Sequence, residues 1–436
     1  TAVGAYAALY QTDVNDAFGY QAMRGASGTS TGYYNVAVGR QSMYSQTTGT
    51  NNVAVGMQSL YSNTTASNNT AVGYQSAYTN STGDALAAFG TYALYSNTTG
   101  AQNAAFGYQA LYSNTTGSFN VAVGKNALQS NTVASNQTAV GYQAGYYAAG
   151  SSNGSNSWLG YQAGYLVAVG GSNVGIGYQA QYASGGTGGG SNVSVGYQAQ
   201  YSNLGGSTNV AVGYQASYSN QSGSDTTAVG TQALYSNTGQ SNDAFGYRAL
   251  YNNTSGTYNV AVGKQALYSN TTASNNTAVG YQAGYNITTG ANNLCVGYVA
   301  GTDAVANITT ASNNIVMGNN SHTNAYIKVS WTVTSDQRDK TSFAPVSLGL
   351  SFINSLTPTA YRFRVSREDE TAIGAIRYGF KAQDILAAEG ANPVIIDNTD
   401  PENLKYNQDS MIAVLVNAIK ELKAEVDSLK SQLKGN

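Results

Sequence analysis

The sequence predicts an all-β solenoid, a parallel β-roll or β-helix, followed by a small α+β domain that ends in a coiled coil. Three observations lead to this prediction. A short motif recurs at a near-constant interval through most of the chain, charged residues are concentrated in the last part, and the final segment shows a heptad pattern of apolar residues. We therefore divide the chain into a repeat rod, residues 1–330, and a C-terminal domain, residues 331–436.

The repeat has the form N-x-A-V-G-Y-Q-A-x-Y-S-N-x-T-x-G and is centred on a glycine. Twelve of the eighteen intervals between successive core glycines are 17 residues, and the others lie between 15 and 21. A period this regular is typical of a solenoid, in which each repeat forms one coil. At about 4.8 Å per coil, nineteen coils would make a rod of roughly 90 Å. The core glycines are Gly4, Gly19, Gly39, Gly56, Gly73, Gly90, Gly107, Gly124, Gly141, Gly160, Gly177, Gly196, Gly213, Gly230, Gly246, Gly263, Gly280, Gly297 and Gly318.

Several positions counted from the core glycine are restricted. The residue before it is apolar in every copy, the residue two before it is usually Ala, and the residue three after it is Ala or Ser in all nineteen copies. Short alternating runs of this kind predict two tightly packed strands per coil. A helix is excluded, because a unit with a glycine in mid-run and an N-T-T-G turn lacks an apolar stripe of period 3.6.

Two polar columns are expected along the rod. Asn occupies the fourth position before the glycine in 15 of 18 copies, and Tyr recurs five residues after it. Because stacked coils place identical positions above one another, the amides should form hydrogen bonds along the axis and the tyrosines should stack. Trp158 and Cys295 stand where Ala is usual, two residues before the glycine. We expect Trp158 to mark an irregular coil and Cys295 to be a small packing residue.

The composition excludes several classes of function. Charged residues make up 9% of the chain and the net charge is −2, so no basic surface for nucleic acid or anionic membrane is expected. With His322 and Cys295 as its single histidine and cysteine, the chain is expected to need no metal or other cofactor and to have no Ser-His-Asp triad. The few acids of the rod argue against an enzyme that cleaves external polysaccharide. These acids are Asp13, Asp16, Asp84, Asp225, Asp243 and Asp303.

From about Thr1 to Asn320, the motif N-x-A-V-G followed by a small residue resembles the head repeats of trimeric autotransporter adhesins and related repeats of phage fibres. This resemblance implies a left-handed parallel β-roll in which three chains pack around one axis. A thin coil with few large apolar groups buries little surface by itself, and association of chains would add the missing burial. A homotrimer is therefore expected.

Apolar residues near the C-terminus follow alternating spacings of 3 and 4. They occupy the a and d positions of a short parallel coiled coil over residues 410–434, about three heptads long. These residues are Ile412, Leu415, Ile419, Leu422, Val426, Leu429 and Leu433. The pattern agrees with a trimer but does not by itself fix the number of strands.

Ser335, Asp336, Arg338 and Lys340 match the S-D-x-R-x-K motif of the intramolecular chaperone, or auto-processing peptidase, domain at the ends of phage tail fibres and endosialidases. The resemblance extends over about Ser335 to Leu433. It implies that Ser335 is a nucleophile, that Lys340 is its general base, and that the bond after Thr334 is cleaved. This activity would be a single self-cleavage with no external substrate. In this chain an acid, Asp339, precedes the lysine, which departs from the family.

These observations predict the distal part of an extracellular phage tail fibre, with a trimerisation chaperone that removes itself before Ser335. The alternative is a trimeric adhesin on a bacterial cell surface or an extracellular filament protein. The expected partners are further copies of the chain, a host-surface receptor with carbohydrate as a candidate, and other virion tail proteins through a part preceding Thr1. Host binding is expected in the tyrosine-lined rod or its insertions near Gly150 to Gly190, and not in residues 335–436.

Overall fold

A computed structural model describes the chain except for residues 10–13, 26–29, 148–154, 168–169, 183–188, 304–305, 323–324, 327, 329–334, 365–366, 368, 403 and 435–436. It forms two compact units. The first comprises Thr1–Thr302 and Ile308–Met317, and the second comprises Asp303–Asn307 and Gly318–Asn436. None of the helices in the described part of the chain is both long and apolar enough to span a membrane.

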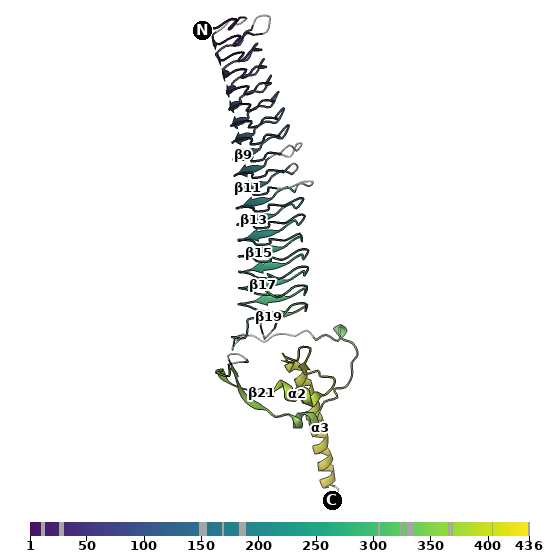
Figure 1. Cartoon of the computed structure of the whole chain (residues 1–436). Coiled ribbons are helices and arrows are strands. Elements are labelled where there is room, and N and C mark those ends of the chain that lie inside the picture. Colours follow the sequence, from purple (N-terminus) through teal and green to yellow (C-terminus); the bar gives the residue numbers. More distant parts are fainter. Residues whose placement is uncertain are drawn as a thin grey trace. The chain divides into compact units, whose positions relative to one another are not determined.

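The first unit is a parallel β-solenoid, as predicted (Figure 1). Its nineteen strands form one sheet in which each strand pairs with the strands of the adjacent coils, and equivalent motif positions are in register, as for Ala54 and Ala71. The strands are β1 (Ala2–Val3), β2 (Asn15–Phe18), β3 (Asn35–Val38), β4 (Val53–Val55), β5 (Thr70–Val72), β6 (Ala87–Phe89), β7 (Ala104–Phe106), β8 (Val121–Val123), β9 (Thr138–Val140), β10 (Ser157–Leu159), β11 (Val174–Ile176), β12 (Val193–Val195), β13 (Val210–Val212), β14 (Thr227–Val229), β15 (Asp243–Phe245), β16 (Val260–Val262), β17 (Thr277–Val279), β18 (Leu294–Val296) and β19 (Ile315–Met317).

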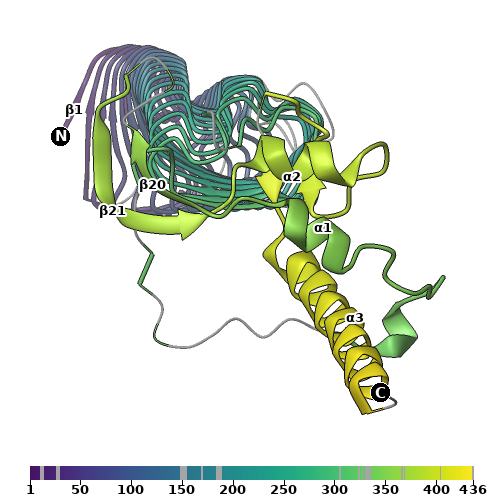
Figure 2. The ribbon, with the colours of Figure 1, turned by 90° about the horizontal axis from the view of Figure 1, so that it is seen from below.

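The prediction of two strands per coil is wrong, because each described coil contains one short strand and closes through turns. The backbone turns at residues with positive φ, which recur two and four residues after the glycine and five before it. Examples are Gln58 at 59°, Leu60 at 47° and Asn68 at 60°. A left-handed residue cannot continue an extended strand. Figure 2, which looks at the solenoid from below, shows successive coils following nearly the same path.

The core glycine is required by both its backbone and its surroundings. Gly107 has a φ of 140°, in a region that side chains of L-residues rarely adopt. A Cβ atom on Gly107 would lie 2.5 Å from the carbonyl oxygen of Gly124 in the next coil. The repeat therefore depends on glycine wherever two coils approach at this corner.

The interior of each coil is narrow and is filled by small or medium-sized side chains. Ala54, Ser59 and Leu60, at two before, three after and four after the glycine, are fully buried. By contrast, Val55 immediately before the glycine is 36% exposed, and Phe106 at the same position is 40% exposed. The solenoid thus turns its smallest apolar residues inward and many of its largest outward.

Asparagine ladders connect the coils, as predicted for the position four before the glycine. The Oδ1 atom of Asn52 accepts from the backbone N–H of Asn69 at 2.9 Å, and its Nδ2 donates to the carbonyl of Ala66 at 2.8 Å. The partners are backbone groups, so this ladder differs from a direct stack of amides. A direct amide ladder, not predicted, lies seven residues after the glycine, where Asn97 Nδ2 donates to Asn80 Oδ1 at 2.8 Å.

The tyrosine column five residues after the glycine is confirmed. The rings of Tyr61 and Tyr78 have centroids 5.0 Å apart and planes inclined by 16°, and the column continues through Tyr95. A second column, one residue after the glycine, includes Tyr161 and Tyr178 with centroids 4.9 Å apart. Because the rings stack face to face, each covers the faces of its neighbours, and the second column presents ring edges and hydroxyl groups to solvent.

Trp158 does not mark an irregular coil, so that prediction is wrong. It is 1% exposed and lies in β10, which pairs in register with β9 and β11. Glycines replace the usual larger residues around its ring: a Cβ atom on Gly164 would lie 2.3 Å from Trp158 Cδ2, and Cβ atoms on Gly145 and Gly175 would also clash. Three neighbouring coils together accommodate one large side chain.

Replacing Trp158 with Ala should destabilise the rod by about 3–5 kcal/mol, because the neighbouring glycines cannot fill the resulting cavity. Urea denaturation followed by circular dichroism measures this change. As a control, Trp158→Phe should be milder, because it keeps most of the ring and removes an indole N–H that has no hydrogen-bond partner. Equal stability of Trp158→Ala and the unchanged chain would contradict the packing described here.

The second unit contains short helices and two small antiparallel sheets in addition to one long helix. After the 3₁₀ turn η1 (Gln337–Asp339) its elements are α1 (Leu350–Ser355), β20 (Thr359–Arg364), β21 (Ala372–Gly379), α2 (Ala382–Glu389), β22 (Ile396–Asp397), β23 (Lys405–Tyr406) and α3 (Gln408–Lys434). Its core is small and comprises Phe352, Ile385, Ile395, Ile396, Met411 and Val414. The predicted α+β character of this unit is thus observed, and one continuous helix covers the predicted segment 410–434.

Candidate functional site

The two predicted catalytic residues lie together around η1. The Nζ atom of Lys340 donates a hydrogen bond to Ser335 Oγ. The side chain of Asp336 caps η1 by accepting from the backbone N–H of Arg338 at 2.8 Å, and it also binds the Arg338 guanidinium. These bonds lower the pKa of the Asp336 carboxyl below its ordinary value. The tight turn therefore returns the lysine to the serine five positions earlier.

Asp339 makes no ion pair with Lys340 within the described part of the chain, so the departure from the motif leaves the lysine directed at Ser335. The bond predicted to be cleaved follows Thr334, which lies outside the described residues. Ser335 and Lys340 are both exposed in the single chain. A lysine acts as a general base when desolvation favours its neutral form. Nothing in the described part of one chain provides that desolvation.

A comparison with protein-family models gives one match in this unit. Residues 335–394 match the family model described as chaperone of endosialidase. The match begins at Ser335 and supports an intramolecular chaperone domain at the C-terminal end of the chain. Searches of curated proteins and of solved structures returned no match.

Helix α3, which follows the matched residues, has two apolar faces. Met411, Val414 and Ala418 are buried against the domain's own core. The predicted a and d residues are exposed, from 38% at Val426 to 79% at Leu433. The face of α3 that packs on the domain's core is held in place by Asn417, whose Nδ2 donates a hydrogen bond to the Leu348 carbonyl at 3.0 Å. The heptad face consequently has no partner among the described residues of this chain.

The carboxylate of Glu421 lies on the same side of α3 as Asn417 and accepts from the backbone N–H of Leu350, the first residue of α1, at 2.6 Å. The Glu389 carboxylate accepts from the N–H groups of Val394, Ile395 and Ile396 at 2.7, 2.6 and 2.9 Å. These two acids hold the small domain together where its apolar core is thin. Neither belongs to the predicted catalytic pair.

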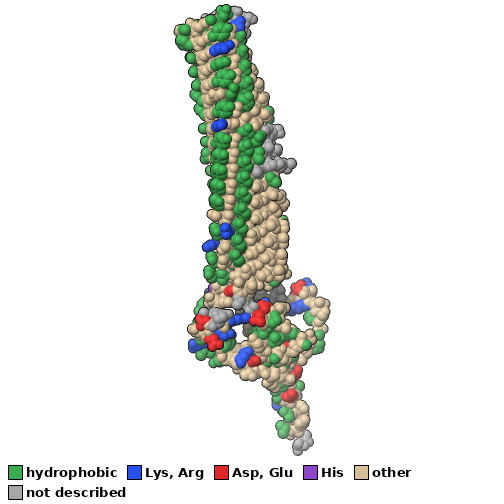
Figure 3. All heavy atoms as spheres, in the orientation of Figure 1, with side chains coloured by type: hydrophobic (Ala, Val, Ile, Leu, Met, Phe, Trp, Pro, Cys, Tyr) green, Lys and Arg blue, Asp and Glu red, His purple; other side chains and the backbone are tan. Residues whose placement is uncertain are grey.

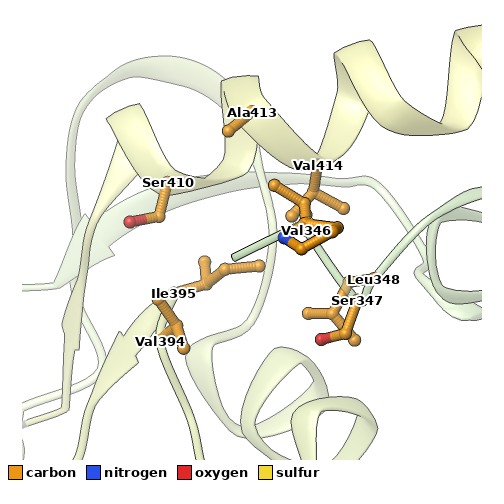
Figure 4. Close-up of a pocket in the computed structure, with 9 residues that line it drawn as sticks. Val346, Ser347, Leu348, Val394, Ile395, Ser410, Ala413 and Val414 are labelled. Carbon is orange, nitrogen blue, oxygen red and sulfur yellow. The ribbon is translucent and has the colours of Figure 1, made fainter. Parts of the chain in front are cut away.

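A pocket of about 260 Å³ lies between α3 and the segments around residues 346 and 394 (Figure 4). Its walls are largely apolar, with Val346, Ile395 and Val414 pointing into the same space. Ser335 and Lys340 are not among the residues that line it. The pocket thus lacks the convergent charged groups of a catalytic site.

The surface of the rod carries long apolar columns beside a broad polar region (Figure 3). The column immediately before the glycines includes Phe89, Leu159, Ile176 and Phe245, which are 36–50% exposed. Continuous exposed apolar surface on this scale is typical of an interaction face. Within the expected binding region near Gly150 to Gly190, residues 150–154, 168–169 and 183–188 lie outside the described part of the chain, as does Asp13.

The remaining candidates, Cys295 and His322, differ in burial, and each has a local structural role. Cys295 is fully buried, and burial raises the pKa of its thiol to about 11. His322 is exposed, and its Nδ1 accepts from the backbone N–H of Asn319 at 3.0 Å. Within the described residues, no group of three or more His, Cys, Asp or Glu side chains is arranged to hold a metal ion.

Proposed function

We propose that this chain is the distal part of a phage tail fibre, a homotrimeric rod whose C-terminal chaperone aligns three chains and then removes itself by one cut before Ser335. The observation that supports this most strongly is the chaperone-family match at the position where Lys340 binds Ser335. The repeat solenoid fits the same reading, because a rod of stacked coils is suited to spacing and display rather than to catalysis. The match favours this function over a bacterial surface adhesin.

Two unpartnered apolar surfaces support the trimer. In the rod, the residue before the core glycine is apolar in every coil, and many of these side chains are exposed. In the chaperone domain, the heptad face of α3 is exposed while the opposite face packs on its own core. Both surfaces would be covered by further copies of the chain, with α3 forming a parallel coiled coil.

Self-cleavage would then follow assembly. Ser335 and Lys340 are hydrogen-bonded but exposed in the single chain, and a lysine needs a desolvated environment to act as a base. A neighbouring chain would supply that environment. Cleavage would therefore occur after the chains have met, and each chain would cut itself once.

The rod would carry the contact with the host. Its exposed tyrosine edges and hydroxyl groups offer hydrogen-bond partners to a surface receptor such as a carbohydrate. The stacked ring faces cover one another, so sugar rings would meet edges and hydroxyls along most of the column. A purified chaperone domain that bound host cells as well as the full chain would contradict this assignment.

The full chain with Ser335→Ala should behave in solution as a particle of about three times the 45.1 kDa chain mass, because its two apolar surfaces need partners. Multi-angle light scattering measures this mass directly. The serine variant keeps the chaperone attached and makes the expected mass unambiguous. A monomer at micromolar concentration in native buffer would rule out the trimer.

A further inference from the structure

The outer face of the solenoid sheet carries two carboxylates on an otherwise uncharged surface. Residues one and three before the core glycine project from the same side of each strand, away from the buried residue between them. The position one before the glycine is apolar in all nineteen coils. The position three before it is uncharged except at Asp16 and Asp243. These two acids therefore stand on the face that would meet another chain. Asp16 is already paired within its own chain, because the amino group of Thr1 lies 2.8 Å from its Oδ1.

Asp243 has no ion-pair partner in the described part of its own chain. It is the first residue of β15 and pairs in register with Thr227 and Val260 in the adjacent strands. A carboxylate that becomes covered by a second protein surface costs several kcal/mol unless a cation meets it. If chains assemble through this face, a basic group of the adjacent chain must therefore lie at the same level along the rod axis as Asp243.

Basic residues of the solenoid lie in the same coil as each acid and in the next coil. Arg248 is in the same coil as Asp243, two residues after Gly246, and Lys264 is in the next coil, one residue after Gly263. A related arrangement occurs at Asp16. Arg40 in the next coil occupies the position of Lys264, whereas Arg24 in the same coil stands five residues after Gly19 rather than two. Lys125 is the one further basic residue of the nineteen coils.

These cations do not reach the acids within one chain. The Arg248 guanidinium lies over the rings of Tyr247 and Tyr251, 5.1 and 5.2 Å from their centroids, and its Nε donates to Gln232 at 2.8 Å. Lys264 Nζ lies 5.8 Å from the Tyr247 ring centroid. The acid stands at the beginning of the strand, whereas both cations follow strand ends, so the two kinds of charge flank the sheet on opposite sides.

Cyclic symmetry brings these two flanks together. When rods stand parallel around a common axis with their sheets inward, the beginning of a strand in one chain lies beside the end of a strand in the next chain at the same height. We propose that Asp243 of one chain pairs with Arg248 and Lys264 of the adjacent chain, and that these pairs fix the register of the rods. This inference rests on the homotrimer proposed above.

The spacing of the charges makes the register specific. Asp16 and Asp243 belong to the second and fifteenth coils, Arg24 and Arg248 to the same two coils, and Arg40 and Lys264 to the third and sixteenth, so each pair is thirteen coils apart. In register, Asp243 would meet both of its cations at the same time as Asp16, which also binds the Thr1 amino group of its own chain, meets Arg24 and Arg40. A slip of one coil removes at least one of the partner chain's cations from each acid, and a larger slip leaves Asp243 against an apolar column with no cation.

Cysteine cross-linking in the full chain tests the contact. Asp243→Cys combined with Arg248→Cys, on the Ser335→Ala background, should give disulfide-linked dimers and trimers on a non-reducing gel. Asp243→Cys combined with Gln198→Cys, which is equivalent to Arg248 but three coils away, should not. The native Cys295 is fully buried and is present in both variants. Linkage by the second pair and not by the first would overturn the proposed register.

Charge reversal provides an independent readout. Asp243→Lys should lower the melting temperature, and adding Arg248→Glu and Lys264→Glu should restore most of the loss. Asp225→Lys makes the same charge change off the strand and serves as the control, and Asp225→Ala measures separately the loss of the hydrogen bond that Thr208 donates to this carboxylate. A monomeric unchanged chain would refute the trimer and this inference with it. A trimer that neither cross-links at residues 243 and 248 nor responds to reversal would refute the charge pairing alone.

Discussion

The full chain purified without substitution is expected to separate into two fragments, one ending at Thr334 and one beginning at Ser335, whereas Ser335→Ala should remain intact at 45.1 kDa. Ser335→Ala lacks the hydroxyl that would attack the carbonyl of Thr334, so its cleavage should be abolished. Cleavage of the unsubstituted chain should be complete within hours. Lys340→Ala should also remain intact, because its Nζ is the group bonded to Ser335 Oγ. Intact-mass spectrometry distinguishes these species.

Two exposed residues in the same domain serve as matched controls. Ser347→Ala and Lys381→Ala should be cleaved at the normal rate, because neither side chain contacts Ser335 or Lys340 in the described structure. Both dyad variants should still assemble, since the heptad face of α3 is unchanged. If the unsubstituted chain stays intact after long incubation, the peptidase role is lost and the chaperone role remains.

Deleting residues 335–436 is expected to give aggregated or misregistered rods instead of uniform trimers. Near-identical coils can pair one repeat out of register at little cost, because each shifted coil still meets a matching surface. A coiled coil at the C-terminal ends would bring three chains together so that the solenoid coils nearest to it are aligned. Light scattering and electron microscopy of negatively stained rods would report mass and length uniformity.

A gentler change tests the same role without removing the domain. Ile419→Asp with Leu422→Asp alters the heptad face, where these residues are 65% and 47% exposed, and leaves the core contacts of Met411 and Val414 intact. It should reproduce the defect of the deletion. Lys420→Asp with Ser428→Asp, at the b and c positions away from the heptad face, should not. If the chain that lacks residues 335–436 forms normal trimers, the chaperone domain is not required for assembly.

The period of the rod and its ladders were predictable because each coil repeats the same contacts along the axis. Asn52 and Tyr61 recur at fixed offsets from the glycine, and stacking converts a recurrence into a column. The second strand per coil was wrongly predicted, because the apolar alternation does not reveal that Gln58 and Leu60 adopt positive φ. Neither residue type favours that conformation, so local propensity contained no signal.

Trp158 shows how a pattern can mislead when positions are considered one coil at a time. The space for its ring is provided by Gly145, Gly164 and Gly175, which belong to three different repeats. A comparison between neighbouring coils could have revealed these glycines. Ser335 and Lys340 were singled out by the resemblance of their motif alone, and the structure adds that a local turn brings the two side chains together. Which apolar column faces outward was not predictable, because Val55 and Ala54 are both apolar and only closure of the coil separates them.

The hydrogen bonds of the Asn52 and Asn97 ladders run along the length of the rod, parallel to any pull applied between its ends. Tension would therefore load each junction between coils in series, and the weakest junction would open first. Each coil that unravels would release on the order of 17 residues of chain, or roughly 55–60 Å of slack. A fibre built this way would lengthen stepwise under load and absorb mechanical work before it broke.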